Sequence, residues 1–168
     1  MSTREHRAAA AGLTAACAVL TVSDTRTAET DEGGRRIVEA LEGAGHRVVE
    51  RALVRDEPAE VQARLVAWLG AGETEVIVTT GGTGIARRDT TVEVVERLLD
   101  KRLEGFGELF RMLSFREVGA AAMLSRAVAG IAGRAAVFAL PGSPAAVRLA
   151  LEELVLPELP HLLRELRR

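Results

Sequence analysis

Residues 76–84 read VIVTTGGTG, a short apolar run that leads directly into a glycine-rich loop. The apolar part, residues 76–78, lacks the alternation of a half-exposed strand, so it predicts a strand buried on both faces. Two further strands are predicted earlier in the chain, at residues 17–22 and 48–54. Buried strands of this type are typical of a parallel sheet that helices cover on both sides.

Helical segments are predicted between these strands. Apolar side chains recur on one helix face before residues 48–54, and Gly45 follows where that helix is expected to stop. Pro58 suits the first turn of a second helix, which precedes residues 76–78. The apolar stripes are Ile37, Val38, Leu41 and Ala44 in the first helix, and Val61, Leu65, Trp68 and Leu69 in the second. The order β-α-β-α-β implies a parallel sheet with right-handed crossovers.

The second half of the chain is more varied. The predicted segments are helices at residues 90–100 and 105–118, strands at residues 127–131 and 135–140, a break at residues 141–144, and two final helices separated by Pro157. The two strands flank Gly133, so they predict a hairpin or an addition at the sheet edge. We therefore expect one α/β domain over residues 15–168, with three layers (α/β/α) and a mostly parallel sheet that carries a small hairpin or edge addition.

The composition limits what such a domain can bind. A chain of 168 residues suits one domain, which buries roughly 70% of its unfolded surface. Tyrosine is absent, aromatic residues make up 3% of the chain and the net charge is -2. We therefore expect neither a platform of aromatic rings on which bases stack nor a basic surface that binds nucleic-acid phosphates. Cys17 is the only cysteine, which excludes an internal disulfide and a thiolate metal cluster.

The first 14 residues predict a disordered tail. Arg4 and Arg7 precede a small-residue stretch at residues 8–18, which loosely resembles a secretory peptide. That stretch is mostly alanine and passes directly into the first predicted strand. We therefore expect the tail to be retained and the protein to be cytoplasmic. No other segment approaches the ~20 apolar residues of a membrane span, so no membrane partner is expected.

Ligands of open α/β sheets bind beyond the carboxyl ends of the strands. The loops that follow predicted strands are residues 23–25, 81–84 and 141–144. Glycines at residues 81–84 let backbone N–H groups converge on an anion. Thr90 and Glu93 have the spacing of a capping box, so Asp89 lies just before a helix. A carboxylate there can hold a Mg²⁺ ion that neutralises phosphates on the glycine loop. The alternative is that Asp89 caps the helix and the glycines form only a turn.

Other side chains admit both a structural and a functional interpretation. Asp56 lies before the second predicted helix, where an acidic residue stabilises the helix dipole by about 0.3–1 kcal/mol. Ser143 before Pro144 predicts a helix N-cap, and a ligand contact there would be additional. Arg111 and Arg126 are able to bind phosphate, although a lone arginine is more often a solvated surface charge.

Four motifs occur in a fixed order along the chain. They are Thr21–Asp24, Gly81–Gly84 followed by Arg88 and Asp89, Ala122–Arg126 with Ala129–Ile131, and Leu140–Pro144. In this combination, the chain resembles the MoaB/Mog proteins and the G domains of plant and animal molybdenum-cofactor enzymes over roughly residues 16–166. Residues 105–111 (GFGELFR) resemble the MoaB branch in particular. Ser143 departs from the eukaryotic motif, which has asparagine at this position.

The resemblance implies adenylylation of molybdopterin by Mg²⁺-ATP with release of pyrophosphate. It implies that Asp56 and Asp89 are catalytic and that Asp89 holds the metal. The implied nucleotide contacts are Ser23, Asp24, Gly81, Gly82, Thr83 and Gly84, and the implied pterin contacts are Ser114, Ser125, Arg126, Pro141, Gly142 and Ser143. A downstream molybdenum insertase is an implied partner. Two alternatives stay open: a pterin-binding or scaffold protein without turnover, and a CinA-like hydrolase of a nucleotide pyrophosphate.

The helix predicted at residues 105–118 is apolar over most of its circumference. Such helices are usually buried on several sides, and one small domain has limited room to cover them. A neighbouring subunit is therefore expected to cover this helix, although the last two predicted helices are an alternative cover. The resemblance points the same way and implies a homotrimer or a homohexamer.

Overall fold

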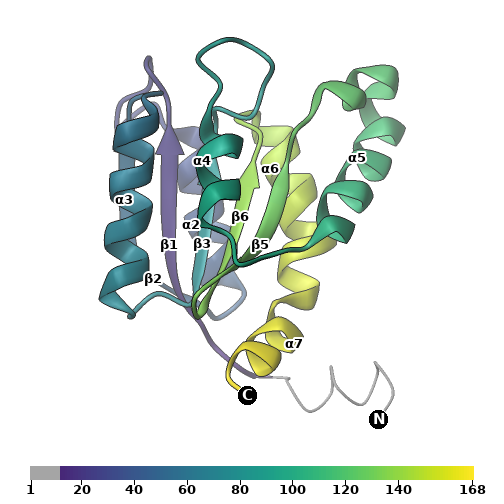
Figure 1. The fold of residues 1–168 in the computed structure, drawn as a ribbon. Helices are drawn as coiled ribbons and strands as arrows, with labels where there is room; N and C mark the ends of the chain where they lie inside the picture. The colour runs from purple at the N-terminus through teal and green to yellow at the C-terminus, as the bar shows by residue number, and fades with distance from the viewer. Residues whose placement is uncertain (1–11) are drawn as a thin grey trace.

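The computed structural model describes residues 12–168, which form a central sheet with helices on both faces (Figure 1). The strands are β1 (Ala16–Val22), β2 (Arg47–Val54), β3 (Val76–Thr80), β4 (Lys101–Arg102), β5 (Val128–Ala132) and β6 (Ala135–Leu140). Their order in the sheet is β2-β1-β3-β6-β5-β4. β2, β1, β3 and β6 are parallel, whereas β5 is antiparallel to β6 and β4 is antiparallel to β5. The predicted three-layer fold with a hairpin addition is confirmed.

The two faces of the sheet are covered by helices from different parts of the chain. One face carries α2 (Glu32–Gly43), α5 (Glu104–Val118), α6 (Pro144–Ala150) and α7 (Leu156–Leu166), and the other carries α3 (Pro58–Ala71) and α4 (Thr91–Leu98). The division follows the alternation of side chains along a strand. In β1, Cys17 and Val19 pack under the first set of helices, while Ala18 and Leu20 pack under the second. Apart from Thr21, the residues of this strand are apolar, as expected where both faces are buried.

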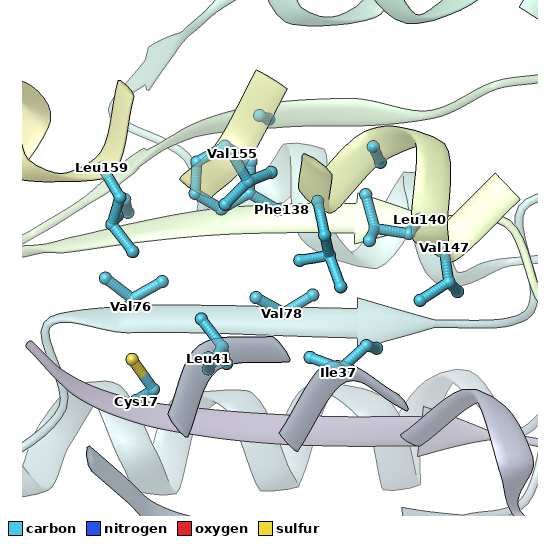
Figure 2. Close-up of a cluster of buried hydrophobic side chains, with 14 of the residues drawn as sticks. Cys17, Ile37, Leu41, Val76, Val78, Phe138, Leu140, Val147, Val155 and Leu159 are labelled. Carbon is cyan, nitrogen blue, oxygen red and sulfur yellow. The ribbon is translucent and has the colours of Figure 1, made fainter. Parts of the chain in front are cut away.

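The larger of the two core clusters joins β1, β3 and β6 to α2, α6 and α7 (Figure 2). Ile37 and Leu41 of α2 are fully buried against the sheet. At the other side of the cluster, the rings of Phe106 and Phe138 pack edge to face with centroids 5.4 Å apart. Burying one such side chain contributes about 1.5–3 kcal/mol. Packing in this cluster therefore stabilises the helices far more than the helix propensities of their residues do.

The helix predicted at residues 90–100 is correct at its start and wrong at its end. Thr90 is the N-cap of α4, but the helix ends at Leu98. The Asp100 N–H donates instead to the Ile131 carbonyl at 2.7 Å, where the chain begins to pair with β5. The predicted capping box is also wrong. The Thr90 hydroxyl is buried without a hydrogen-bond partner among residues 12–168, and the Glu93 carboxylate accepts from Arg126.

The prediction that Pro157 separates two helices is wrong. α6 continues through a π-helical turn, Leu151–Val155, directly into α7. Pro157 lies in the first turn of α7, and Pro160 lies inside that helix. Proline lacks the N–H donor that a regular α-helix requires, and its ring clashes with the carbonyl group four residues earlier. The change of hydrogen-bond register at the π turn lets the helical path continue where that donor is missing.

The predicted tail covers residues 1–14, of which residues 1–11 lie outside the described part of the chain. Leu13 packs against the larger core cluster. The Thr14 carbonyl accepts a hydrogen bond from Nη2 of Arg167 at 2.6 Å. From residue 12 onwards, no helix is both long and apolar enough to cross a bilayer.

β1 and β3 are neighbours in the sheet, but the chain leaves them toward opposite edges. From β1 it goes to β2 at one edge, and from β3 it goes through α4 to β4 at the other. The strand order therefore reverses between β1 and β3, which is where open α/β sheets bind ligands. In Figure 1 the connection from β3 to α4 forms a loop beyond this end of the sheet.

Candidate functional site

The three loops singled out in the sequence meet at the carboxyl ends of β1, β3 and β6. The Gly81 N–H donates to the Leu140 carbonyl at 3.1 Å, and the Thr80 hydroxyl donates to the Pro141 carbonyl at 3.0 Å. Gly81 has φ +98, and a Cβ on it would lie 2.2 Å from the Val22 carbonyl oxygen. Only glycine satisfies both the left-handed backbone and this contact with the end of β1. The three loops that follow predicted strands therefore lie together at one end of the sheet.

Three aspartates gather beside the glycine loop. The Asp56 N–H donates to Oδ1 of Asp24 at 3.1 Å, which joins the loop after β2 to the loop after β1. The other two carboxylates lie against glycines of the loop. A Cβ atom added to Gly82 would lie 3.2 Å from Oδ1 of Asp56, and a Cβ atom added to Gly84 would lie 2.6 Å from Oδ2 of Asp89. The glycines therefore allow both carboxylates to approach the loop backbone closely.

Arg88 organises the acidic side of this cluster. Its guanidinium donates from Nε to Oδ2 of Asp24 at 3.0 Å and from Nη2 to Oε1 of Glu57 at 2.9 Å. Nη2 also lies 3.3 Å from the Asp56 carbonyl oxygen, to which it donates. Arg88 thus forms ion pairs with both Asp24 and Glu57, and its bond to Asp56 goes to the main chain rather than to the carboxylate.

The consequence is a marked electrostatic asymmetry. Hydrogen bonds from Arg88 and from the Asp56 N–H lower the pKa of Asp24. Burial raises the pKa of Asp56, and the nearby charges of Asp89 and Asp24 raise it further, against the opposing charge of Arg88. Oδ1 of Asp56 is buried with no hydrogen-bond partner among the described residues. Asp56 is therefore a half-buried carboxylate whose Oδ1 has no hydrogen-bond partner, next to the glycine loop.

The donor set fits a magnesium ion that arrives with a nucleotide. Within residues 12–168, no group of three or more His, Cys, Asp or Glu side chains is placed to hold a metal by itself. Mg²⁺ commonly takes one or two carboxylates and completes its shell with water and substrate phosphates. Asp56 supplies an unpartnered oxygen, and Asp89 commits one oxygen, Oδ2, to the Ala86 N–H at 2.8 Å. These two residues fit the role of carboxylate ligands.

Two cavities lie on either side of the contact between Gly81 and Gly142. The Ser23 cavity, of about 490 Å³, is lined by Thr21, Val22, Ser23, Arg26, Asp31, Gly33, Thr80, Gly81, Gly142, Ser143 and Pro144. The Ser125 cavity, of about 420 Å³, is lined by Gly81, Gly82, Thr83, Gly84, Asp89, Leu124, Ser125, Pro141 and Gly142. Each cavity contains residues expected at the nucleotide and residues expected at the pterin. The structure therefore interleaves the two predicted sets rather than separating them.

Several predicted site residues have structural partners. The Ser23 hydroxyl accepts from the N–H groups of Thr25 and Arg26, both at 3.2 Å. The Ser143 hydroxyl caps α6 by accepting from the Ala146 N–H at 3.2 Å, and Pro144 occupies the first turn, as predicted. Ser114 is buried on α5 and lines neither cavity.

Arg126 has partners of another kind. Its guanidinium bonds to the Gly84 carbonyl, the Asp89 carbonyl and the Glu93 carboxylate.

Asp31 is a site residue that the sequence reasoning missed. It is buried in the wall of the Ser23 cavity and accepts from the Gly34 N–H, the Thr21 hydroxyl and Arg51 at 2.8–2.9 Å. Burial alone would raise the pKa of Asp31, but these hydrogen bonds outweigh it and lower the pKa. An aspartate three residues before Gly34, just ahead of a helical stripe, is an N-cap signal that could have revealed it.

Comparisons with known proteins agree with this geometry. Residues 18–161 match the family model described as a probable molybdopterin binding domain. The chain is 48% identical over 169 residues to molybdenum cofactor biosynthesis protein B of Bacillus cereus, which covers 100% of this chain and 99% of the relative.

Solved structures are similar over nearly the whole chain. A crystal structure of molybdenum cofactor biosynthesis protein B has a TM-score of 0.91 at 48% identity, covering 94% of this chain and 99% of that one. The tungsten cofactor synthesizing protein MoaB from Pyrococcus furiosus has a TM-score of 0.84 at 40% identity, covering 94% and 100%.

Proposed function

This chain belongs to the family of molybdenum cofactor biosynthesis proteins with the probable molybdopterin binding domain, and we propose that it transfers the adenylyl group of ATP to molybdopterin. One observation carries the proposal. Asp56 presents a buried, unpartnered carboxylate oxygen beside a glycine loop, and a second carboxylate, Asp89, lies against the same loop. A buried carboxylate oxygen without a partner is typical of a site where a bound ion or ligand completes the interaction.

The proposed reaction needs no covalent enzyme intermediate. An oxygen of the pterin substrate forms a bond to the α-phosphorus of ATP while the bond from that phosphorus to the bridging oxygen breaks, and pyrophosphate leaves. Alignment of these atoms and neutralisation of their charge supply the catalysis. Magnesium would be held by Asp56 and Asp89 and would supply charge neutralisation for the phosphates.

The protein's own groups have distinct tasks in this scheme. Backbone N–H groups of residues 81–84 bind phosphate oxygens, because the glycines allow close approach. Arg88 holds Asp24 and Glu57 in ion pairs, which keeps these carboxylates from repelling the incoming phosphates as free charges. The Ser23 and Ser125 cavities meet at Gly81 and Gly142, so the two substrates would occupy opposite sides of this contact.

The test is pyrophosphate release by the purified protein with ATP, Mg²⁺ and molybdopterin, each omitted in turn. We expect release only when all three are present. Hydrolysis of a nucleotide pyrophosphate to two phosphate monoesters, measured in a separate incubation without the pterin, would favour the CinA-like hydrolase. Molybdopterin binding, followed by the fluorescence of the pterin, with no release under any condition would favour the non-catalytic protein and overturn the proposal.

A further inference from the structure

Arg126 lies between η1 (Gly119–Leu124) and β5, yet its side chain bonds to a loop some forty residues earlier in the chain. Nε donates to the Gly84 carbonyl oxygen at 2.8 Å, and Nη2 donates to the Asp89 carbonyl oxygen at 2.6 Å. Nη1 donates to a carboxylate oxygen of Glu93 in α4. One guanidinium therefore joins both ends of the segment from Gly84 to Asp89 to the helix that follows it.

The other side chain that ties this segment to the rest of the protein is Arg88, which bonds to Asp24, Glu57 and the Asp56 carbonyl oxygen. Residues 84–88 are exposed, and Ile85 at 69% is among the most exposed large apolar side chains of the described chain. The bonds inside it are the Ala86 N–H to Oδ2 of Asp89 and the Asp89 N–H to the Ala86 carbonyl, at 2.8 and 3.0 Å. Those bonds shape the loop but do not attach it to the sheet. The Arg126 bonds go to main-chain carbonyls, so they set where the backbones of Gly84 and Asp89 lie.

Glu93 is the counterpart that keeps the guanidinium in place. Burial raises the pKa of Glu93, but the hydrogen bond from Arg126 outweighs it and lowers the pKa. Oε2 of Glu93 is buried without a partner among residues 12–168, so loss of Arg126 would remove the ion-pair partner of this carboxylate and leave it the weaker interactions with its own N–H and with Arg97. The planar fork of arginine reaches three acceptors at once, which the single ammonium of lysine cannot do.

We propose that Arg126, held by Glu93, is a positioning residue that sets Asp89 and the glycine loop for adenylyl transfer, and that it does not contact the pterin. The inference rests on the proposed function and departs from the pterin contact implied by the family resemblance. Three of the five guanidinium N–H donors are taken by protein acceptors, and Arg126 lines neither the Ser23 cavity nor the Ser125 cavity. Misplacing a reacting group by about 1 Å costs roughly 10²-fold in rate, which is the scale of effect expected here.

The first test does not depend on any reaction. Amide hydrogen exchange of Arg126→Gln should be at least ~10-fold faster at Ala86 and Thr91, whose N–H groups bond within this region, and unchanged at β1 and β3. Arg167→Gln is the matched control, because Arg167 also bonds to a main-chain carbonyl (Thr14) and a carboxylate (Glu75), at the opposite end of the sheet. Unchanged exchange at residues 84–91 in Arg126→Gln would overturn the proposal, whatever reaction the protein catalyses.

The second test separates positioning from substrate contact. Arg126→Gln and Arg126→Lys should both lower kcat for pyrophosphate release by ~10²-fold with little change in the KM for molybdopterin, and Glu93→Gln should lower kcat to a lesser extent. The double variant Arg126→Gln/Glu93→Gln should lower kcat by less than the product of the two single-variant factors, since it leaves no Glu93 carboxylate without its ion-pair partner. A raised KM for molybdopterin at unchanged kcat would instead make Arg126 a pterin contact. If the unmodified protein shows no release, the proposed function fails, while the exchange experiment still decides the role of Arg126.

Discussion

Asp24 and Asp56 show how two adjacent carboxyl groups acquire opposite properties. Asp24 is exposed and paired with Arg88, so its pKa falls. Asp56 is more buried, and one of its oxygens, Oδ1, has no hydrogen-bond partner in the described chain, so its pKa rises. The charged form of Asp56 is thus disfavoured in the free protein. Such stored destabilisation is common at sites that a ligand later satisfies.

We predict that Asp56→Asn stabilises the free protein and abolishes pyrophosphate release. The pKa of Asp56 is raised in the folded protein, so ionisation of this carboxyl group disfavours folding. The folded state therefore loses stability as pH rises from the unfolded pKa, about 3.9, through the folded value. Thermal denaturation should show a higher Tm than that of the unmodified protein at pH 7. The difference should vanish below about pH 4. A lower Tm for the variant at pH 7 would contradict this account.

We predict that Asp89→Asn lowers the rate of pyrophosphate release by at least ~10²-fold, as for loss of a group that stabilises transition-state charge. The fold should persist, because asparagine keeps a carbonyl oxygen to accept the Ala86 N–H bond that Oδ2 of Asp89 accepts now. Asp100→Asn is the control, since Asp100 likewise accepts one loop N–H, that of Gly133, away from the site. Near-normal release by Asp89→Asn at unchanged Tm would remove Asp89 from the mechanism.

The glycine loop and the end of β1 act as one unit at the scale of elements. Gly81 fits against the Val22 carbonyl, and its N–H bonds to the end of β6. Gly142, after β6, packs back against Gly81, where an added Cβ would lie 3.5 Å from the Gly81 Cα. The carboxyl ends of three strands therefore support one another. The shape of the two cavities depends on this close backbone packing.

We predict that Gly81→Ala destabilises the protein by about 1–3 kcal/mol through backbone strain and a clash with β1. The added Cβ would lie 2.2 Å from the Val22 carbonyl oxygen at a φ of +98, so the loop must move. Chemical denaturation measures the loss of unfolding free energy, and nucleotide binding should weaken as well. Gly43→Ala is the control, because Gly43 lies in α2 with open space around its Cβ position. Equal stability of the two variants would show that the loop tolerates the side chain.

At the scale of the whole molecule, α5 divides its apolar surface between two environments. Phe106 and Phe110 are buried against the sheet. Exposed apolar side chains continue along its outer side and into η1: Leu109, Met112, Phe115, Val118, Met123 and Leu124. α6 and α7 pack in the same layer without covering this row, so the alternative of a cover within the chain does not account for it. An exposed apolar row of this length is typical of an interaction surface.

We predict that the protein is a homotrimer or homohexamer in which α5 lies at a subunit interface. Light scattering after size exclusion should give three or six times the 17.9 kDa chain mass. Phe115→Asp should shift the mass toward the monomer, because it buries a charge in the interface. Val66→Asp, at a similarly exposed apolar residue of α3, should leave the mass unchanged. A monomer at micromolar concentration for the unmodified protein would defeat the prediction.

Much of the fold was predictable from local patterns. The buried strands around Val19 and Val78 carry an unbroken apolar signal, and the Ser143–Pro144 cap is a signal of adjacent residues. The three loops of the site follow from strand order alone, since parallel strands end at the same edge. Each of these features depends on residues close together in the chain, or on a rule of topology.

Other features depended on which distant residues the fold brings together. The sequence pairs Glu93 with Thr90 in a capping box, but the folded chain places Arg126 beside Glu93, and a charged partner outcompetes the local N–H. The end of α4 is decided by the Ile131 carbonyl, thirty-one residues after Asp100. Likewise, the opposite pKa shifts of Asp24 and Asp56 require knowing that Arg88 reaches Asp24 but not the Asp56 carboxylate. Periodicity and spacing encode which face of an element is buried, whereas the partner of a polar group is chosen by three-dimensional proximity and charge, which a linear pattern does not contain.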